Sequence, residues 1–170
     1  MSNLIKLEQI AKECINSGNN QMFIYIEPKL THSSVQRLCN DAVFLNRIEI
    51  LDYLLNKRID INTLLLTIIF KDNILLLDYY LVTRAVPQSD INNLALVACP
   101  YASQYTLEYL TNYVTNYNEF GLKALVCRKF KVFDRLLSDD RINMDEIYKL
   151  AIENNVDLDE LCTLFTKWKF

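Results

Sequence analysis

A fourteen-residue pattern recurs along the chain, and this recurrence constrains the fold more than any other feature of the sequence. The clearest copy runs from Ala42 to Leu55 and is followed by Asn56 to Asn62. Further copies begin at residues 14, 68, 98, 124 and 151, so successive starts are 28, 26, 30, 26 and 27 residues apart. The copy at 98 is weak, and the copy at 151 fits only with one extra residue. Because so small a unit cannot bury its apolar face alone, neighbouring units are expected to stack.

The apolar residues of the clearest copy have the spacing of a helix. Ile48, Leu51 and Leu55 are separated by three and four residues, which places them on one helix face. The chain has only 2 glycines and 3 prolines in 170 residues, whereas average usage would supply roughly twelve and eight. Sheet proteins need such residues in their turns, so the sequence predicts an all-α chain of short helices and short loops.

The copy at Ala42 resembles the second half of an ankyrin repeat. It shares with that family the small residues at its start, Glu49, a Leu-Leu pair and the closing Asp60-Ile61-Asn62. Asn46 and Arg58 stand where the family has glycine. Asparagine tolerates the left-handed backbone that such a position often requires, whereas arginine fits it poorly.

The intervals are shorter than the ankyrin value of about 33 residues. The β-turn and the Thr-Pro-Leu-His segment that open an ankyrin repeat are missing, so bare helix pairs are expected. Over roughly residues 10 to 165, the chain is similar to degenerate ankyrin-related proteins of large DNA viruses, such as poxviruses and the multigene families of asfarviruses. The resemblance implies an all-α solenoid of about six short helix-pair repeats, ankyrin-like without prominent β-hairpins. One domain is expected over 1-170, with an N-terminal cap at about 1-30 and a C-terminal cap at about 145-170 in which Trp168 packs back on the last pair.

Polar residues precede several of the expected helices. Asp60 and Ser89-Asp90 each stand just before an apolar run, where a helix N-cap is expected. His32 is interpreted as part of a loop that leads to an N-cap for a helix through Val35 and Leu38.

Net charge and apolar runs exclude several classes of partner. The formal net charge is −3, which leaves no basic face for binding nucleic acid. The N-terminus lacks the pattern of a secretory signal, and the longest apolar stretch, Leu64 to Phe70, is far shorter than the roughly 20 residues that cross a bilayer. No nucleic-acid and no membrane partner is therefore expected.

The cysteines do not form a metal-binding or disulfide pattern. Their odd number and the absence of a CxxC spacing favour reduced thiols in the cytoplasm, with the nucleus not excluded, and the residues are Cys14, Cys39, Cys99, Cys127 and Cys162. Cys14 and Cys99 occupy small-residue positions of the pattern, so they are expected in the core. No metal and no cofactor is expected.

Catalytic residues are sparse, and the chain is not expected to be an enzyme. His32 is the single histidine, and its nearest nucleophiles are Ser33, Ser34 and Cys39. The 2 glycines are isolated and cannot form a phosphate-binding loop. The acidic groups around Asp139-Asp140, Asp145-Glu146 and Asp157 to Glu160 are expected on solvated surface and at helix starts.

Five tyrosines recur every four residues, and on one continuous helix they would form a stripe: Tyr101, Tyr105, Tyr109, Tyr113 and Tyr117. Two interpretations remain open. Tyrosine is enriched in protein interfaces, so the stripe is a candidate partner-binding face. Alternatively, the rings fill a widened gap between helix pairs and their hydroxyls reach water.

By elimination, the sequence predicts a non-catalytic protein–protein interaction module, which would bind a host factor if the chain is viral. The alternative is a structural or assembly component, either a homo-oligomer or a virion-associated protein, since the apolar content is high for a small solenoid. Positions near expected loops or on the tyrosine stripe give the candidate partner-binding residues: Arg58, Asp60, Arg84, Gln88, Tyr101, Tyr105, Asn116, Tyr117 and Arg141.

Overall fold

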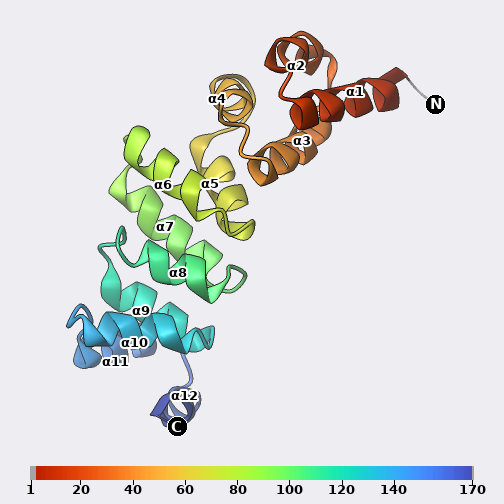
Figure 1. Cartoon of the computed structure of the whole chain (residues 1–170). Coiled ribbons are helices and arrows are strands. Elements are labelled where there is room, and N and C mark those ends of the chain that lie inside the picture. The colour runs from red at the N-terminus through yellow and green to blue at the C-terminus, as the bar shows by residue number, and fades with distance from the viewer. Residues whose placement is uncertain (1–2, 170) are drawn as a thin grey trace. The chain divides into compact units, whose positions relative to one another are not determined.

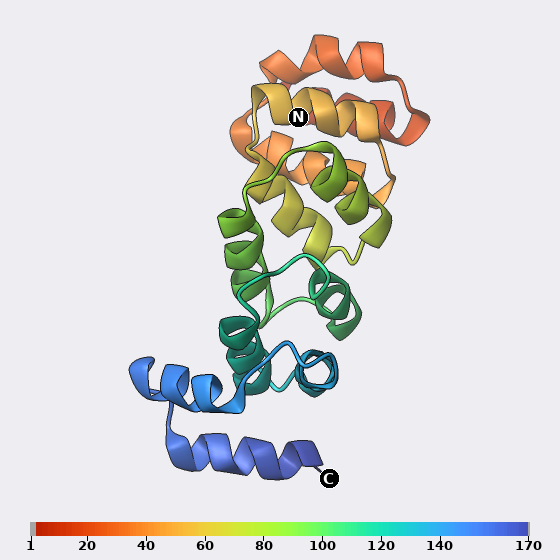
Figure 2. The same ribbon diagram turned by 90° about the vertical axis from the view of Figure 1, so that its left-hand side faces the viewer.

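The computed structural model describes residues 3–169, apart from the side chains of Leu158 and Lys169 (Figure 1). Within this range the chain forms twelve α-helices, one short 3-10 helix and no strand, so the predicted all-α fold is confirmed. Figure 2 shows the same succession of short helices and short turns from the side. The helices are α1 (Asn3–Ser17), α2 (Asn20–Ile26), η1 (Glu27–Lys29), α3 (His32–Phe44), α4 (Ile48–Lys57), α5 (Ile61–Phe70), α6 (Ile74–Thr83), α7 (Gln88–Ala98), α8 (Gln104–Leu110), α9 (Tyr117–Val126), α10 (Phe130–Ser138), α11 (Met144–Glu153) and α12 (Leu158–Lys169).

The chain divides into two compact units, Met1–Arg84 with α1 to α6 and Ala85–Phe170 with α7 to α12. Each unit contains three consecutive helix pairs. The expectation of a single domain over the whole chain stays a prediction.

In the first unit, the first helices of successive pairs contact one another. α3 packs on α1 and α5 as well as on its own partner α4, and α2 packs on α4. The first helices therefore form one layer, and the second helices α2 and α4 form another. The apolar stripe of each helix is buried in the core of this unit, where fully buried residues include Ile15, Phe23, Leu38, Leu51, Leu54 and Leu65.

The second unit repeats this arrangement. α9 packs on α7, α10 and α11, and α8 packs on α10. The ring of Phe133 on α10 is wholly buried, and its centroid lies 5.4 Å from that of Trp168 and 5.9 Å from that of Phe165, both on α12. Trp168 thus packs on α10, which belongs to the pair before the last.

The fifth position of the recurring pattern has a left-handed backbone in five of the six copies. It lies in the turn between the two helices of a pair, and φ is 74° at Gly18, 54° at Asn46, 52° at Asp72, 58° at Arg128 and 53° at Asn155. Asn46 therefore adopts the conformation for which ankyrin repeats use glycine, as its tolerance of that conformation allows.

The remaining copy lacks the left-handed residue, and so does the second glycine position of the ankyrin pattern. In the weak copy at 98, α7 ends at Ala98 and α8 begins only at Gln104, so a longer turn replaces the left-handed residue. At the second glycine position of the ankyrin pattern, Arg58 has φ −136° and ψ −24°. Because φ is negative, the position does not require glycine, and arginine can occupy it.

Side chains of one helix pair donate hydrogen bonds to backbone carbonyl groups near the end of the first helix in the preceding pair. Arg47 Nε donates to the carbonyl oxygen of Ile15 at 2.7 Å, and Asn73 Nδ2 donates to that of Val43 at 2.9 Å. Donor and acceptor are 32 and 30 residues apart, close to one interval of the pattern. Because the last carbonyls of a helix have no partner within it, these contacts both satisfy the carbonyls and tie successive pairs together.

One predicted N-cap is confirmed and another is wrong. The Asp60 carboxylate accepts a hydrogen bond of 2.8 Å from the backbone N–H of Thr63, at the start of α5. Asp90 does not cap α7, because that helix begins at Gln88, directly after Pro87. Asp90 lies in the first turn instead, where a negative charge still interacts favourably with the helix dipole.

Candidate functional site

The second unit carries a groove of about 600 Å³ that crosses α7, α9 and the turn after α11; we call it the α7–α9 groove. Its apolar lining consists of Leu96, Val97, Pro100, Tyr101, Leu122, Val126 and Val156. Leu122 is nearly buried, whereas Val97 is 54% and Tyr101 78% exposed. A concave surface with accessible apolar side chains is the usual form of a binding site.

A tight turn after α7 places Tyr101 in the groove lining. The backbone N–H groups of Tyr101 and Ala102 both donate to the carbonyl oxygen of Ala98, at 2.9 and 2.8 Å. Ala98 and Ala102 are buried on either side of the turn. Tyr101 lies between these two buried alanines, and the conformation of the turn exposes its side chain.

The polar rim of the groove lies on α9. Glu119 and Lys123 are one helical turn apart and both line the groove. The Glu119 carboxylate accepts a hydrogen bond from the side-chain amide of Asn116, whereas the Lys123 side chain is exposed. The groove thus offers an apolar floor with one negative and one positive group beside it.

The three candidate residues of the first unit take part in contacts within that unit. Arg58 pairs with Glu27 at 2.6 Å, and Arg84 pairs with Asp52 at 2.5 Å. Asp60 is the N-cap of α5 described above. Their polar groups are engaged in contacts between and at the ends of helices.

The candidate residues of the second unit are spread over several turns. Gln88 Nε2 donates to the carbonyl oxygen of Tyr113 at 2.7 Å. Arg141 Nη1 donates to the carbonyl oxygen of Thr111 at 2.7 Å, and its guanidinium lies 5.4 Å from the ring centre of Tyr117. Tyr105 on α8 is 70% exposed and does not line the groove.

The five tyrosines do not share one helix. α8 ends at Leu110, so it carries only Tyr105 and Tyr109, and α9 begins at Tyr117. The hydroxyls of Tyr109 and Tyr113 are 2.9 Å apart, and both rings are half-buried. A single stripe is therefore not formed, although Tyr101 and Tyr105 do reach solvent.

Sequence reasoning missed a cluster of a carboxylate, a tyrosine and an arginine, which joins η1, directly after α2, to α4 in the first unit. Glu27 is only 2% exposed and binds Arg58 as well as the hydroxyl of Tyr53, which donates to it at 3.2 Å. Burial, followed by the nearby charge of Glu27, raises the pKa of Tyr53. The hydroxyl therefore keeps its proton and serves as a donor.

The same cluster occurs one helix pair later. The hydroxyl of the fully buried Tyr80 donates to Asp52 at 3.1 Å, and Arg84 binds the same carboxylate oxygen. Burial and the charge of Asp52 raise the pKa of Tyr80. The sequence signal for both clusters was a spacing. An acidic residue precedes a tyrosine by 26 or 28 positions, and an arginine follows that tyrosine after four or five positions.

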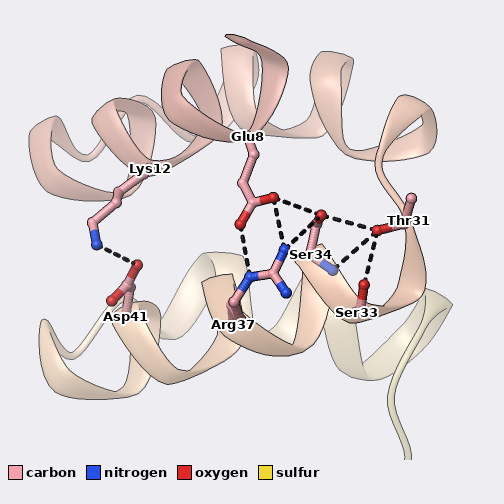
Figure 3. Close-up of polar contacts among 7 residues, drawn as sticks. All are labelled: Glu8, Lys12, Thr31, Ser33, Ser34, Arg37 and Asp41. Carbon is pink, nitrogen blue, oxygen red and sulfur yellow. Dashed lines mark hydrogen bonds and ion pairs between the residues drawn. The ribbon is translucent and has the colours of Figure 1, made fainter. Parts of the chain in front are cut away.

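A third polar cluster joins α1 to α3 (Figure 3). Glu8 accepts hydrogen bonds from Ser34 Oγ at 2.7 Å and from Arg37 Nε at 2.8 Å. The contact with Arg37, followed by that with Ser34, lowers the pKa of Glu8 to about 2. So weak a base cannot draw a proton from a serine hydroxyl at neutral pH, so this arrangement holds two helices and does not activate Ser34.

The residues considered for histidine-assisted catalysis are not assembled. His32 is the exposed first residue of α3, directly after its N-cap Thr31. Among the described contacts, no hydrogen bond joins the imidazole to Ser33, Ser34 or Cys39. Burial raises the pKa of the Cys39 thiol to about 11, so it stays protonated at neutral pH.

The described residues contain neither a candidate metal site nor a candidate membrane span. No three side chains of the His, Cys, Asp and Glu types converge there to bind a metal ion. None of the helices in that part of the chain is both long and apolar enough to cross a membrane.

No protein-family model matches the chain, and neither does any curated protein or solved structure.

Proposed function

We propose that this chain is an ankyrin-like α-solenoid of about six helix-pair repeats that binds another protein and has no catalytic role. The observation that carries the proposal is the α7–α9 groove, in which Val97 and Tyr101 expose large apolar areas beside the nearly buried Leu122. Exposing such side chains is unfavourable unless a partner covers them.

The similar backbone conformation of the turns supports the proposal that the chain consists of helix-pair repeats. Five of six copies of the pattern have a positive φ at the same position. The contacts of Arg47 with Ile15 and of Asn73 with Val43 join successive pairs at about one interval of the pattern. Helix pairs that contact their neighbours through equivalent positions are the building principle of solenoids.

The chemistry of the groove favours an amphipathic segment of a partner protein. Apolar side chains of the segment would cover Val97 and Leu122, and polar ones would meet Glu119 and Lys123 at the rim. Tyr101 is suited to anchor the contact, because tyrosine combines a large apolar ring with a hydroxyl. The resemblance to proteins of large DNA viruses supports a host protein as the partner.

Two of the nine candidate residues are part of this proposal. Tyr101 lines the groove, and Asn116 binds Glu119 at the rim. The other seven stay predictions.

Selection from a displayed random-peptide library tests the proposal with a defined probe. The wild-type chain and a V97D/V126D variant serve as baits, and L75D is the control because Leu75, on α6 of the first unit, is 81% exposed. We expect peptides that bind the wild type and L75D equally well but bind V97D/V126D at least about tenfold more weakly. The reason is that each carboxylate buried under a bound peptide costs more than about 1.4 kcal/mol. Equal binding to all three baits would remove the groove from the proposal.

Self-assembly is the second candidate function. The first unit also exposes apolar side chains, with Phe44 74% and Leu75 81% accessible. Sedimentation of the wild type, L75D and V97D/V126D at micromolar concentration separates the two functions. A wild type that is monomeric favours the interaction module, and an oligomer that L75D or V97D/V126D dissociates favours the assembly role.

A further inference from the structure

One face of α9 forms the central strip of the α7–α9 groove. Four residues of this helix line the groove, and they occupy positions i, i+3, i+4 and i+7: Glu119, Leu122, Lys123 and Val126. Residues at this spacing lie on a single helix face. Since seven residues of an α-helix rise about 10 Å, the strip is about two helical turns long.

The rest of the lining comes mainly from the turns after the helices on which α9 packs. Pro100 and Tyr101 follow α7, and Asn154 and Val156 follow α11. α9 packs on both of these helices. The lining thus consists of helices and the turns that follow them, and the described part of the chain contains no strand. A partner cannot bind here by adding a strand to the edge of a sheet.

This lack of a sheet edge favours one conformation of the partner segment. An extended segment over Leu122 and Val126 would leave backbone N–H and C=O groups unpaired, which is unfavourable where water is excluded. A helix pairs these groups within itself. It also presents apolar side chains at the same spacing of three and four residues as the strip on α9. The groove therefore suits a helix better than an extended segment.

The charges of α9 give such a helix a direction. Glu119 lies in the first turn of α9, and Lys123, four residues later, begins its last turn. An antiparallel helix with a glutamate four residues before a lysine would place its glutamate beside Lys123 and its lysine beside Glu119. Its dipole would oppose that of α9, and a glutamate before a lysine is the order that stabilises a helix by itself.

We infer that the α7–α9 groove binds an amphipathic helix of a partner protein, antiparallel to α9, with an acidic residue one turn before a basic one beside its apolar face. The acidic residue pairs with Lys123 and the basic residue with Glu119, while the apolar face covers Leu122 and Val126. This inference rests on the proposed function, because it names the form and the direction of the segment that the groove would bind.

Three synthetic peptides of about sixteen residues, long enough to form an isolated helix, serve as probes. The first carries leucines on one helix face and, beside them, a glutamate four residues before a lysine. The second exchanges the glutamate and the lysine, and the third is the first with a proline at its centre. Fluorescence anisotropy of the labelled peptides measures their affinity for the full-length chain.

The wild type should bind the first peptide at least about threefold more tightly than the second, since two attractive contacts are replaced by two repulsive ones. It should bind the proline peptide at least about tenfold more weakly than the first, because proline breaks the helix.

Variants of the chain show whether the preference comes from the groove. In K123E each of the first two peptides would make one attractive and one repulsive contact, so the preference between them should vanish. K131E is the matched control, because Lys131 is an exposed lysine of α10 that does not line the groove, and it should keep the preference. A preference that persists in K123E would come from the peptides' own helicity and would overturn the inference.

The remaining outcomes also decide the matter. Equal affinity of the wild type for the first two peptides overturns the direction, and undiminished binding of the proline peptide overturns the helix. Absence of binding by all three overturns both. The V97D/V126D variant distinguishes these results from failure of the proposed function. Library peptides that bind the wild type but not this variant would keep the groove as a binding site, whatever the form of the segment.

Discussion

The guanidinium of Arg58 lies 2.6 Å from the carboxylate of Glu27, whose residue is only 2% exposed. The two groups come from the end of α4 and from η1, so the ion pair joins consecutive helix pairs of the first unit. A carboxylate with so little access to water is stable in the fold only while a cation and hydrogen bonds compensate its lost hydration.

Replacing Arg58 by methionine should therefore lower the free energy of unfolding by about 2 kcal/mol. This loss is smaller than the roughly 3 to 5 kcal/mol of a broken, fully buried pair, because the Arg58 side chain is 33% exposed. Methionine retains the apolar stem and removes the charge. Urea denaturation measures the change. R37M is the matched control, since Arg37 also bonds to a glutamate but is 60% exposed, and it should lose far less. Similar losses in both variants would show that burial of Glu27 does not matter.

Acid should weaken the contact between α1 and α3. The folded chain holds the Glu8 carboxylate down to a pKa of about 2, whereas the ordinary value is 4.5. The unfolded chain therefore binds the proton first, and the stabilisation, complete above about pH 5, is lost as the pH falls from about 4.5 to about 2. In E8Q the stability should depend less steeply on pH in this window. E153Q, at the exposed end of α11, should retain the wild-type slope, and an unchanged slope in E8Q would refute the assignment.

The turn after α9 should be stabilised by glycine. Arg128 has φ 58°, a conformation that is unfavourable for a residue with a Cβ atom. R128G should raise the free energy of unfolding by about 0.5 to 1 kcal/mol, because relief of this strain exceeds the added entropy of glycine in the unfolded chain. K131G, at an exposed position in the first turn of α10, should lower it by up to about 1 kcal/mol. The opposite signs, measured by chemical denaturation, distinguish backbone strain from a general effect of glycine.

Asp60 should contribute to stability as a helix cap. D60A removes the acceptor for the backbone N–H of Thr63 and should cost about 1 kcal/mol in thermal or urea unfolding. D60N retains that acceptor and should cost much less. If D60N is as unstable as D60A, the charge of Asp60 is responsible and not its capping bond.

Much of the local structure could be predicted from the sequence. The spacing of Ile48, Leu51 and Leu55 predicted a helix, and the position of Asn46 predicted a turn that tolerates a left-handed backbone; both are found. These properties depend on residues within a few positions of one another. The prediction failed for the tyrosines, where the spacing of four residues suggested one helix, because the turns around Tyr101 and Tyr113 interrupt it.

The groove and the clusters could not be predicted in the same way. Val97 is 54% exposed while Leu94, one helical turn before it on α7, is 5% exposed, although both are apolar. The packing of α7 against its neighbours, which include α8 and α9, decides which of them is covered. Likewise, Arg58 was expected near a binding surface, whereas its partner Glu27, 31 residues away, engages it within the first unit.

The sequence by itself determined the helical character of the chain and several of its turns, because apolar spacing, capping and backbone preference act over a few neighbouring residues. The tertiary structure decided which apolar side chains stay exposed in the groove and which charges are buried. These outcomes depend on pairs such as Glu27 with Arg58 and Asp52 with Arg84, and such pairs come together only when one helix pair packs on the next.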